Sequence, residues 1–191
     1  MDRKQFVDLS DEEQMTWTAD YYDSAMSVRG SVLNAVTGLE MSIDLYITHY
    51  FTNDDIKSEE LMNLIIAPRM SFENKVQVLM VLIERYDSSI IEENKSMNRD
   101  LINIIEERNI IAHYPLDITP PGLKTYYESG NLTFFKFKNV RTNSIKGEKK
   151  EIKLTNSIVY NVNKSEDLLN SINKYHLIIT MAIPTAPPPT I

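Results

Sequence analysis

NRDLINIIEERNIIAHY, residues 98–114, combines a helical repeat of apolar residues with polar residues set inside that repeat. At about 100° per residue, four of its residues share one face: Leu101, Ile105, Arg108 and Ala112. The pattern therefore predicts a helix that carries Arg108 in the middle of its core-facing side. The rest of the chain has to supply both the core and a partner for this arginine.

A guanidinium cannot lose its charge, and burying one without a partner costs several kcal/mol. We therefore expect either a carboxylate from a neighbouring helix or a cleft that binds an anion to face Arg108. Glu40 and Asp44, one turn apart in the long apolar-striped stretch 21–51, are the candidate partners. The alternative is that both carboxylates are solvated.

Asn109 and His113 fall together on the flank of the predicted helix. Pro115 disfavours helical conformation at Tyr114, so we expect the helix to end near His113. Carbonyl groups without helical partners in the last turn favour a protonated ring, which makes His113 a candidate acid or base near neutral pH. The alternative interpretation is a histidine that only caps the helix.

These residues carry a resemblance to a known family. Arg108, Asn109, Ala112 and His113 match the R-N-x-x-A-H form of the Arg-x4-6-His motif of the HEPN superfamily. The resemblance covers about residues 20–114 and the last predicted helix. It implies a small α-helical protein that works as a homodimer, with the arginine and histidine of both protomers lining one cleft. Ile110 projects opposite to Arg108, which also suggests that a partner covers one side.

The resemblance further implies a metal-independent endoribonuclease that uses the 2′-hydroxyl of the RNA as nucleophile and needs no cofactor. Arg108 would clamp the phosphate, His113 would act as general acid or base, and Asn109 would orient the substrate. The alternative is a non-catalytic HEPN-like module that binds a nucleotide, RNA or a protein partner. Either chemistry fits a toxin, with an antitoxin as partner, or a phage-defence protein.

Composition limits the other classes of function. With 191 residues and 42% hydrophobic residues, the chain is expected to form a single domain over residues 1–183, followed by a proline-rich extended tail at 184–191. No cysteine is present, which removes disulfides and the usual zinc ligands. His49 and His176 lack a second ligand nearby and are interpreted as ordinary helix residues. Without a leader or an apolar run of about 20 residues, we expect a cytoplasmic protein.

The formal net charge of −7 disfavours nonspecific coating of nucleic acid. Basic residues are nevertheless concentrated in residues 124–153, while the predicted helical remainder is acidic. If the chain binds RNA, we expect contacts from Lys136, Lys138, Arg141, Lys149 and Lys150.

Apolar residues at helical spacing predict a mainly α fold, an antiparallel helical bundle. Ser10 and Glu13 have the spacing of a capping box, which predicts the start of a lead-in helix. Gly30 and Gly38 are candidates for close helix–helix approach. The predicted helices are the lead-in, to about residue 20, and then 21–51, 58–67, 71–86, 98–113 and 166–181.

A small antiparallel β-hairpin or ribbon is predicted as an insertion at about residues 123–155, before the last helix. Pro120-Pro121-Gly122 is expected to break the chain, and alternating residues predict strands at 124–128, 131–139 and 149–154. Leu132 and Phe134 would lie on one face, and Phe135 and Phe137 on the other. We favour packing of one face on the bundle over stacking of bases, because so small a ribbon needs cover.

Overall fold

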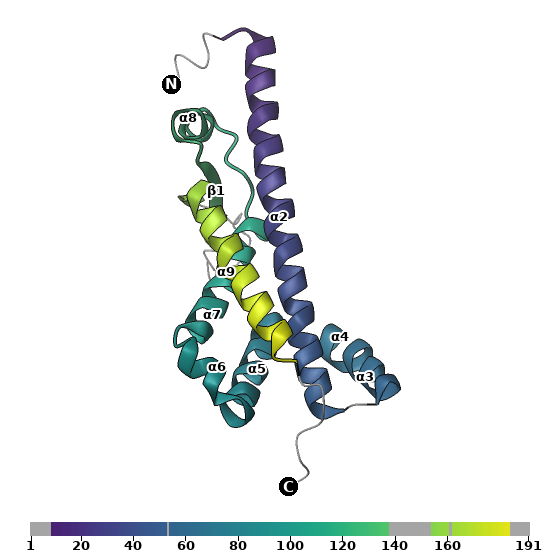
Figure 1. Cartoon of the computed structure of the whole chain (residues 1–191). Helices are drawn as coiled ribbons and strands as arrows, with labels where there is room; N and C mark the ends of the chain where they lie inside the picture. Colours follow the sequence, from purple (N-terminus) through teal and green to yellow (C-terminus); the bar gives the residue numbers. More distant parts are fainter. Residues whose placement is uncertain (1–8, 53, 138–153, 161, 184–191) are drawn as a thin grey trace, which may run out of the picture. The chain divides into compact units, whose positions relative to one another are not determined.

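The computed structural model describes residues 9–52, 54–137, 154–160 and 162–183. The protein is mainly helical and carries a two-stranded antiparallel sheet, which confirms the predicted class at this level. The elements are drawn in Figure 1. They are α2 (Asp11–Phe51), α3 (Asp55–Leu61), the π-helix η1 (Met62–Ile66), α4 (Ala67–Arg69), α5 (Phe72–Tyr86), α6 (Ser88–Glu93), α7 (Met97–His113), α8 (Pro120–Ser129), β1 (Leu132–Phe137), β2 (Leu154–Tyr160) and α9 (Val162–Met181).

The chain divides into two compact units. Unit 1 consists of Met1–Ser31 and Asn109–Glu166, and unit 2 of Val32–Arg108 and Asp167–Ile191. Three helices, α2, α7 and α9, each contribute residues to both units. The prediction of a single domain over residues 1–183 stays a prediction.

Helix α2 begins with the predicted capping box. The Ser10 amide donates to Glu13 Oε2 at 2.9 Å, and the Glu13 amide donates to Ser10 Oγ at 3.3 Å. The expected break near residue 20 was wrong, because α2 continues as one helix of 41 residues. Residues 11–29 contain no glycine or proline, so nothing in the sequence stops helix propagation there.

In unit 2, α2 and α9 pack closely and run in the same direction (Figure 1). On α9, the side chain of Ser42 contacts two residues one turn apart: its Oγ lies 3.3 Å from His176 Nδ1 and 3.1 Å from Thr180 Oγ1. A Cβ on Gly38 would lie 3.5 Å from the His176 ring, which confirms close approach there. This pair is therefore parallel, unlike helices of the predicted antiparallel bundle, and the long connection 52–161 makes that possible.

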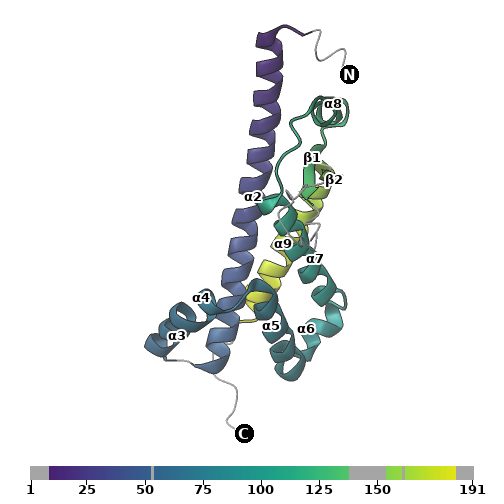
Figure 2. The same cartoon turned by 180° about the vertical axis from the view of Figure 1, so that it is seen from behind.

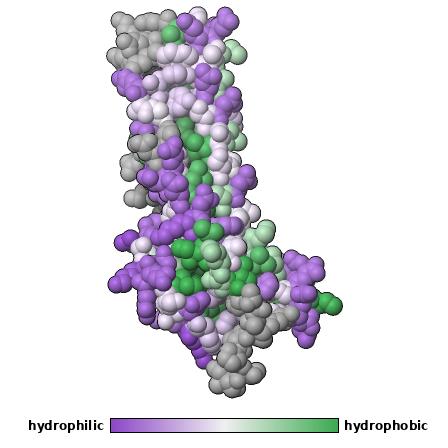
Figure 3. Space-filling view, in the orientation of Figure 1, coloured by the Kyte–Doolittle hydropathy of each residue, from purple (hydrophilic) through white to green (hydrophobic). Residues whose placement is uncertain are grey.

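Apolar residues of unit 2 fall into a buried and an exposed set. The buried set of α2 includes Val36, Leu39 and Ile43, and that of α9 includes Ile172 and Ile179. Figure 3 shows apolar side chains gathered on the surface over the last turns of α9 and the adjoining part of α2. The exposed large apolar residues on the unit 2 parts of α2 and α9 are Met41, Phe51, Leu177 and Met181.

In unit 1, the strand predicted at residues 124–128 was wrong, because these residues belong to α8. Pro120 and Pro121 occupy the first turn of this helix, where the missing amide donor has no cost. The proline pair therefore starts a helix rather than ending an element. Gly130 closes α8 with φ 70° and ψ 8°, a left-handed conformation that favours glycine.

The two strands pair antiparallel, with Leu132 opposite Tyr160 and Phe134 opposite Ile158. Figure 2 shows α8 leading into β1 and β2 lying beside β1. Leu132 and Phe134 are buried, which confirms that this face of the ribbon packs. Residues 149–153 of the last predicted strand and the tail 184–191 lie outside the described residues. Its last residue, Leu154, begins β2, which continues to Tyr160.

Across the described part of the chain, no helix combines the length and the apolar character needed to cross a membrane.

Candidate functional site

The predicted motif lies at the C-terminal end of α7, which runs without interruption from Met97 to His113. Its fully buried residues are Met97, Leu101, Ile104 and Ile111. At about 100° per residue, Arg108 falls between Met97 and Leu101 on this side of the helix, and it is half-buried. Asn109 and His113 are exposed in the last turns.

Arg29 of α2 holds the residue that follows the motif. Its Nη2 donates a hydrogen bond to the Tyr114 carbonyl oxygen, and its guanidinium carbon lies 5.2 Å from the centroid of the Phe134 ring. A cation is favoured beside the carbonyl groups at a helix C-terminus. Arg29 Nε is buried and has no hydrogen-bond partner among the described residues.

Sequence reasoning missed Arg29, although a signal was present. It is the only lysine or arginine in residues 11–51, a stretch that contains seven acidic residues. A lone cation in so long a helix needs a specific acceptor, and the chain supplies a backbone carbonyl next to His113.

The chain that leaves α7 pairs with β1. The Phe135 amide donates to the Pro115 carbonyl at 2.9 Å, and the Asp117 amide donates to the Thr133 carbonyl at 2.7 Å. These two hydrogen bonds flank an antiparallel bridge between Leu116 and Phe134. The backbone directly after His113 is therefore held by two contacts, the pairing with β1 and the hydrogen bond from Arg29.

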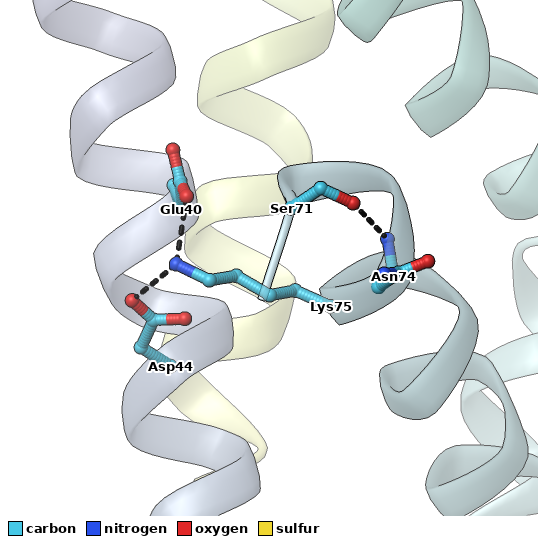
Figure 4. A network of polar contacts seen from close by, with 5 residues as sticks. All are labelled: Glu40, Asp44, Ser71, Asn74 and Lys75. Atoms are coloured by element: carbon cyan, nitrogen blue, oxygen red, sulfur yellow. Dashed lines mark hydrogen bonds and ion pairs between the residues drawn. The ribbon is translucent and has the colours of Figure 1, made fainter. Parts of the chain in front are cut away.

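Lys75 of α5 binds both carboxylates that were predicted to face Arg108. Its Nζ donates to Glu40 Oε1 at 2.7 Å and to Asp44 Oδ2 at 2.9 Å, as Figure 4 shows. The side chains of Lys75 and Asp44 are only 2% and 6% exposed, whereas Glu40 is 29% exposed. The Lys75 cluster, meaning Lys75, Glu40 and Asp44, is therefore a mostly buried charge network. The pairing of Arg108 with either carboxylate stays a prediction.

Burial and pairing shift the pKa values of this cluster in definite directions. Burial lowers the pKa of Lys75, but the hydrogen bonds and negative charges of Glu40 and Asp44 outweigh it, so the pKa is raised. Burial raises the pKa of Asp44, and the contacts with Lys75 only partly offset this. One Asp44 oxygen, Oδ1, is buried without a hydrogen-bond partner among the described residues.

The sequence contained a signal for Lys75 as well. It lies three residues after Phe72 and four before Leu79, inside the apolar stripe of the helix predicted at 71–86. A lysine inside such a stripe needs a partner for its buried charge, as was argued for Arg108. Two carboxylates one turn apart on a neighbouring helix can supply that partner.

A second polar contact holds the first turn of α7 within unit 2. Asp100 Oδ2 accepts hydrogen bonds from Tyr175 Oη and Ser96 Oγ, both at 2.7 Å, and Arg99 lies 3.3 Å from Oδ1. Burial raises the pKa of Asp100, but these hydrogen bonds outweigh it and lower the pKa. The carboxylate is therefore held in its ionised form.

The predicted RNA-contacting residues fall mostly outside the described part of the chain. Lys138, Arg141, Lys149 and Lys150 are among the residues without a described position. Lys136 lies in β1 opposite Asn156, and the structure describes its backbone only. Their contact with RNA stays a prediction.

His49 and His176 make contacts of the kind expected of helix residues. His49 Nδ1 lies 2.9 Å from the Leu45 carbonyl oxygen, and His176 faces Ser42. Over the residues that the structure describes, no group of three or more histidine, cysteine or acidic residues is arranged to hold a metal ion.

A scan against protein-family models, a search of curated proteins and a search of solved structures found no match to this chain.

Proposed function

We propose that this chain is a metal-independent endoribonuclease of the HEPN type. The observation that supports the proposal is the R-N-x-x-A-H motif at the end of one uninterrupted helix, with His113 exposed in its last turn. Exposure gives a substrate access to the ring. A half-buried Arg108, one and a half turns before His113, keeps part of its surface open to an anion.

The reaction needs a group that removes the proton of the 2′-hydroxyl and a group that protonates the leaving 5′-oxygen. A histidine near neutral pH can do either. Arg108 would hold the phosphate and offset the charge that develops on it, while Asn109 would orient the substrate. The products would be a 2′,3′-cyclic phosphate and a free 5′-hydroxyl.

One protomer offers one Arg108 and one His113, whereas the reaction uses both an acid and a base. A homodimer with both motifs in one cleft supplies two histidines and two arginines. The half-buried Ile110, on the opposite side of the helix from Arg108, gives such a dimer an apolar contact.

Within this proposal, Arg29 is a positioning residue. It makes no reaction step, but its hydrogen bond to the Tyr114 carbonyl fixes the backbone next to His113. The proposal also includes a role as a toxin or a phage-defence protein, a cytoplasmic location and an antitoxin partner. A cleavage assay does not test these three points.

The experiment is cleavage of a labelled single-stranded RNA and of a transfer RNA in the presence of EDTA. We compare the wild type with Arg108→Ala and His113→Ala, at matched folding by circular dichroism. The expected result is cleavage that persists in EDTA, leaves a cyclic phosphate and is lost in both variants.

Arg69→Ala and His49→Ala are the matched controls, because both residues lie outside α7 and Arg69 is exposed at the end of α4. Both controls should cleave like the wild type. If the folded, dimeric wild type cuts neither RNA, the nuclease proposal fails, and the alternative, a non-catalytic module that binds a nucleotide, RNA or protein, takes its place.

A further inference from the structure

Helix α2 carries a second apolar stripe within unit 1. Met15, Ala19, Tyr22 and Met26 follow one another at spacings of four, three and four residues, which puts them on one side of the helix. This side differs from the one that Tyr21 and Ala25 bury in the core. Met15, Tyr22 and Met26 are 74%, 51% and 45% exposed.

This stripe forms one wall of a groove. Met15, Ala19 and Tyr22 line it from α2, and Ile118 and Leu123 line it from the segment that enters and begins α8. The groove has a volume of about 930 Å³. Ile118, which lines it opposite α2, is 56% exposed. Spacings of four and three residues are those at which one helix receives the side chains of another.

The charge around the groove limits what can occupy it. Residues 11–28 contain five acidic residues and no lysine, arginine or histidine. All five are exposed: Asp11, Glu12, Glu13, Asp20 and Asp23. A nucleic acid or an anionic membrane would be repelled, and a second copy of α2 would place like charges opposite each other. A basic partner would gain from the same field.

We propose that this groove binds an amphipathic helix of a partner protein, with apolar residues at helical spacing and lysine or arginine beside them. Apolar side chains of the partner pack between the α2 stripe and Ile118, and its basic residues face Asp11 and Asp23, which also line the groove. This surface does not depend on the nuclease proposal, because it uses neither Arg108 nor His113.

The experiment uses the full chain and two synthetic helical peptides. One peptide carries leucine on its apolar side and lysine on its polar side, and the other has glutamate in place of lysine. Binding is measured by fluorescence anisotropy, and the bound surface is located by NMR of methyl-labelled methionine. The expected result is binding of the lysine peptide, with a shifted Met15 signal, and no binding of the glutamate peptide.

The double variant Met15→Ser/Tyr22→Ser should weaken binding of the lysine peptide by about tenfold or more. The matched control Leu177→Ser/Met181→Ser removes exposed apolar side chains of unit 2 and should leave binding unchanged. All four side chains are exposed, so both variants should fold, and circular dichroism checks this.

Three results would overturn the proposal. The first is no binding of the lysine peptide. The second is equal binding to wild type and Met15→Ser/Tyr22→Ser, which would show general attraction to an acidic surface. The third is a dimer in analytical ultracentrifugation that this variant dissociates, which would make a second copy the occupant.

Discussion

Gly122, in the first turn of α8, lies against the backbone of Asp117. A Cβ placed on Gly122 would lie 2.1 Å from the Asp117 carbonyl oxygen and 2.8 Å from its Cγ. Asp117 cannot easily move away, since it is buried and its Oδ1 accepts a hydrogen bond from the Thr119 amide at 3.0 Å. Its own amide also donates to β1.

We therefore expect Gly122→Ala to lower the free energy of unfolding by about 2 kcal/mol or more, as overpacked sites do. The added methyl group must push α8 away from the segment that follows α7. Urea unfolding followed by circular dichroism measures the change.

Gly30→Ala is the control, because no atom beyond its chain neighbours and the nearby backbone of α2 lies within 4 Å of the position that its Cβ would take. Gly30 lies inside α2, where alanine should raise the free energy of unfolding by about 0.5–1 kcal/mol. The two glycine-to-alanine substitutions should thus change the free energy of unfolding in opposite directions. Equal effects would show that the close contact at Gly122 does not limit the packing of α8.

At the scale of elements, the Lys75 cluster joins α5 to α2. Lys75→Met keeps most of the side-chain volume but leaves the Asp44 carboxylate buried without its cation. Breaking a buried pair from one side costs about 3–5 kcal/mol. We expect a loss of this size in the free energy of unfolding, measured by urea denaturation at neutral pH.

Lys57→Met is the matched control. Lys57 pairs with Asp54 at 3.5 Å, and its side chain is 72% exposed, so its loss should cost less than about 1 kcal/mol. The double variant Lys75→Met/Asp44→Asn should recover part of the stability lost in Lys75→Met, because it removes the stranded charge. Strict additivity of the two substitutions would contradict a direct interaction.

Asp100 couples α7 to α9 in a pH-dependent way. Its pKa in the folded protein is lowered below the ordinary value near 4. The carboxylate therefore contributes stability that is fully present above about pH 4 and is lost as the pH falls through the folded-state pKa. Asp100→Asn should be less stable than the wild type near neutral pH, and the difference should shrink in acid.

The measurement is the midpoint of urea unfolding of both proteins between neutral and acidic pH. Asp23→Asn, which changes an exposed carboxylate in the first third of α2, is the control and should differ little in stability from the wild type. A constant gap between wild type and Asp100→Asn across the range would show that Asp100 acts through its shape and not its charge.

The helices were predictable where an apolar stripe was long, and the motif position at the end of α7 followed from Pro115. Local alternation misled at residues 124–128, since two prolines can begin a helix as well as end one. Charge pairing was harder to predict than secondary structure. Lys75 and Arg108 both lie beside apolar residues, and only the three-dimensional packing of α5 on α2 shows that Lys75 binds Glu40 and Asp44.

At the scale of the whole molecule, the proposed nuclease works only as a dimer. We expect the activity per chain to fall steeply when the protein is diluted through the range in which analytical ultracentrifugation shows dissociation. The reason is that each cleft needs the Arg108 and His113 of two protomers. Activity per chain that stays constant across dissociation would contradict the shared cleft and leave a monomeric site.

The two compact units have a consequence for how the gene can be altered. Unit 1 combines Met1–Ser31 with Asn109–Glu166, and unit 2 combines Val32–Arg108 with Asp167–Ile191, so the polypeptide passes from one unit to the other three times. No single cut of the reading frame releases either unit whole. A frameshift or a stop codon anywhere before Glu166 therefore removes part of both units at once.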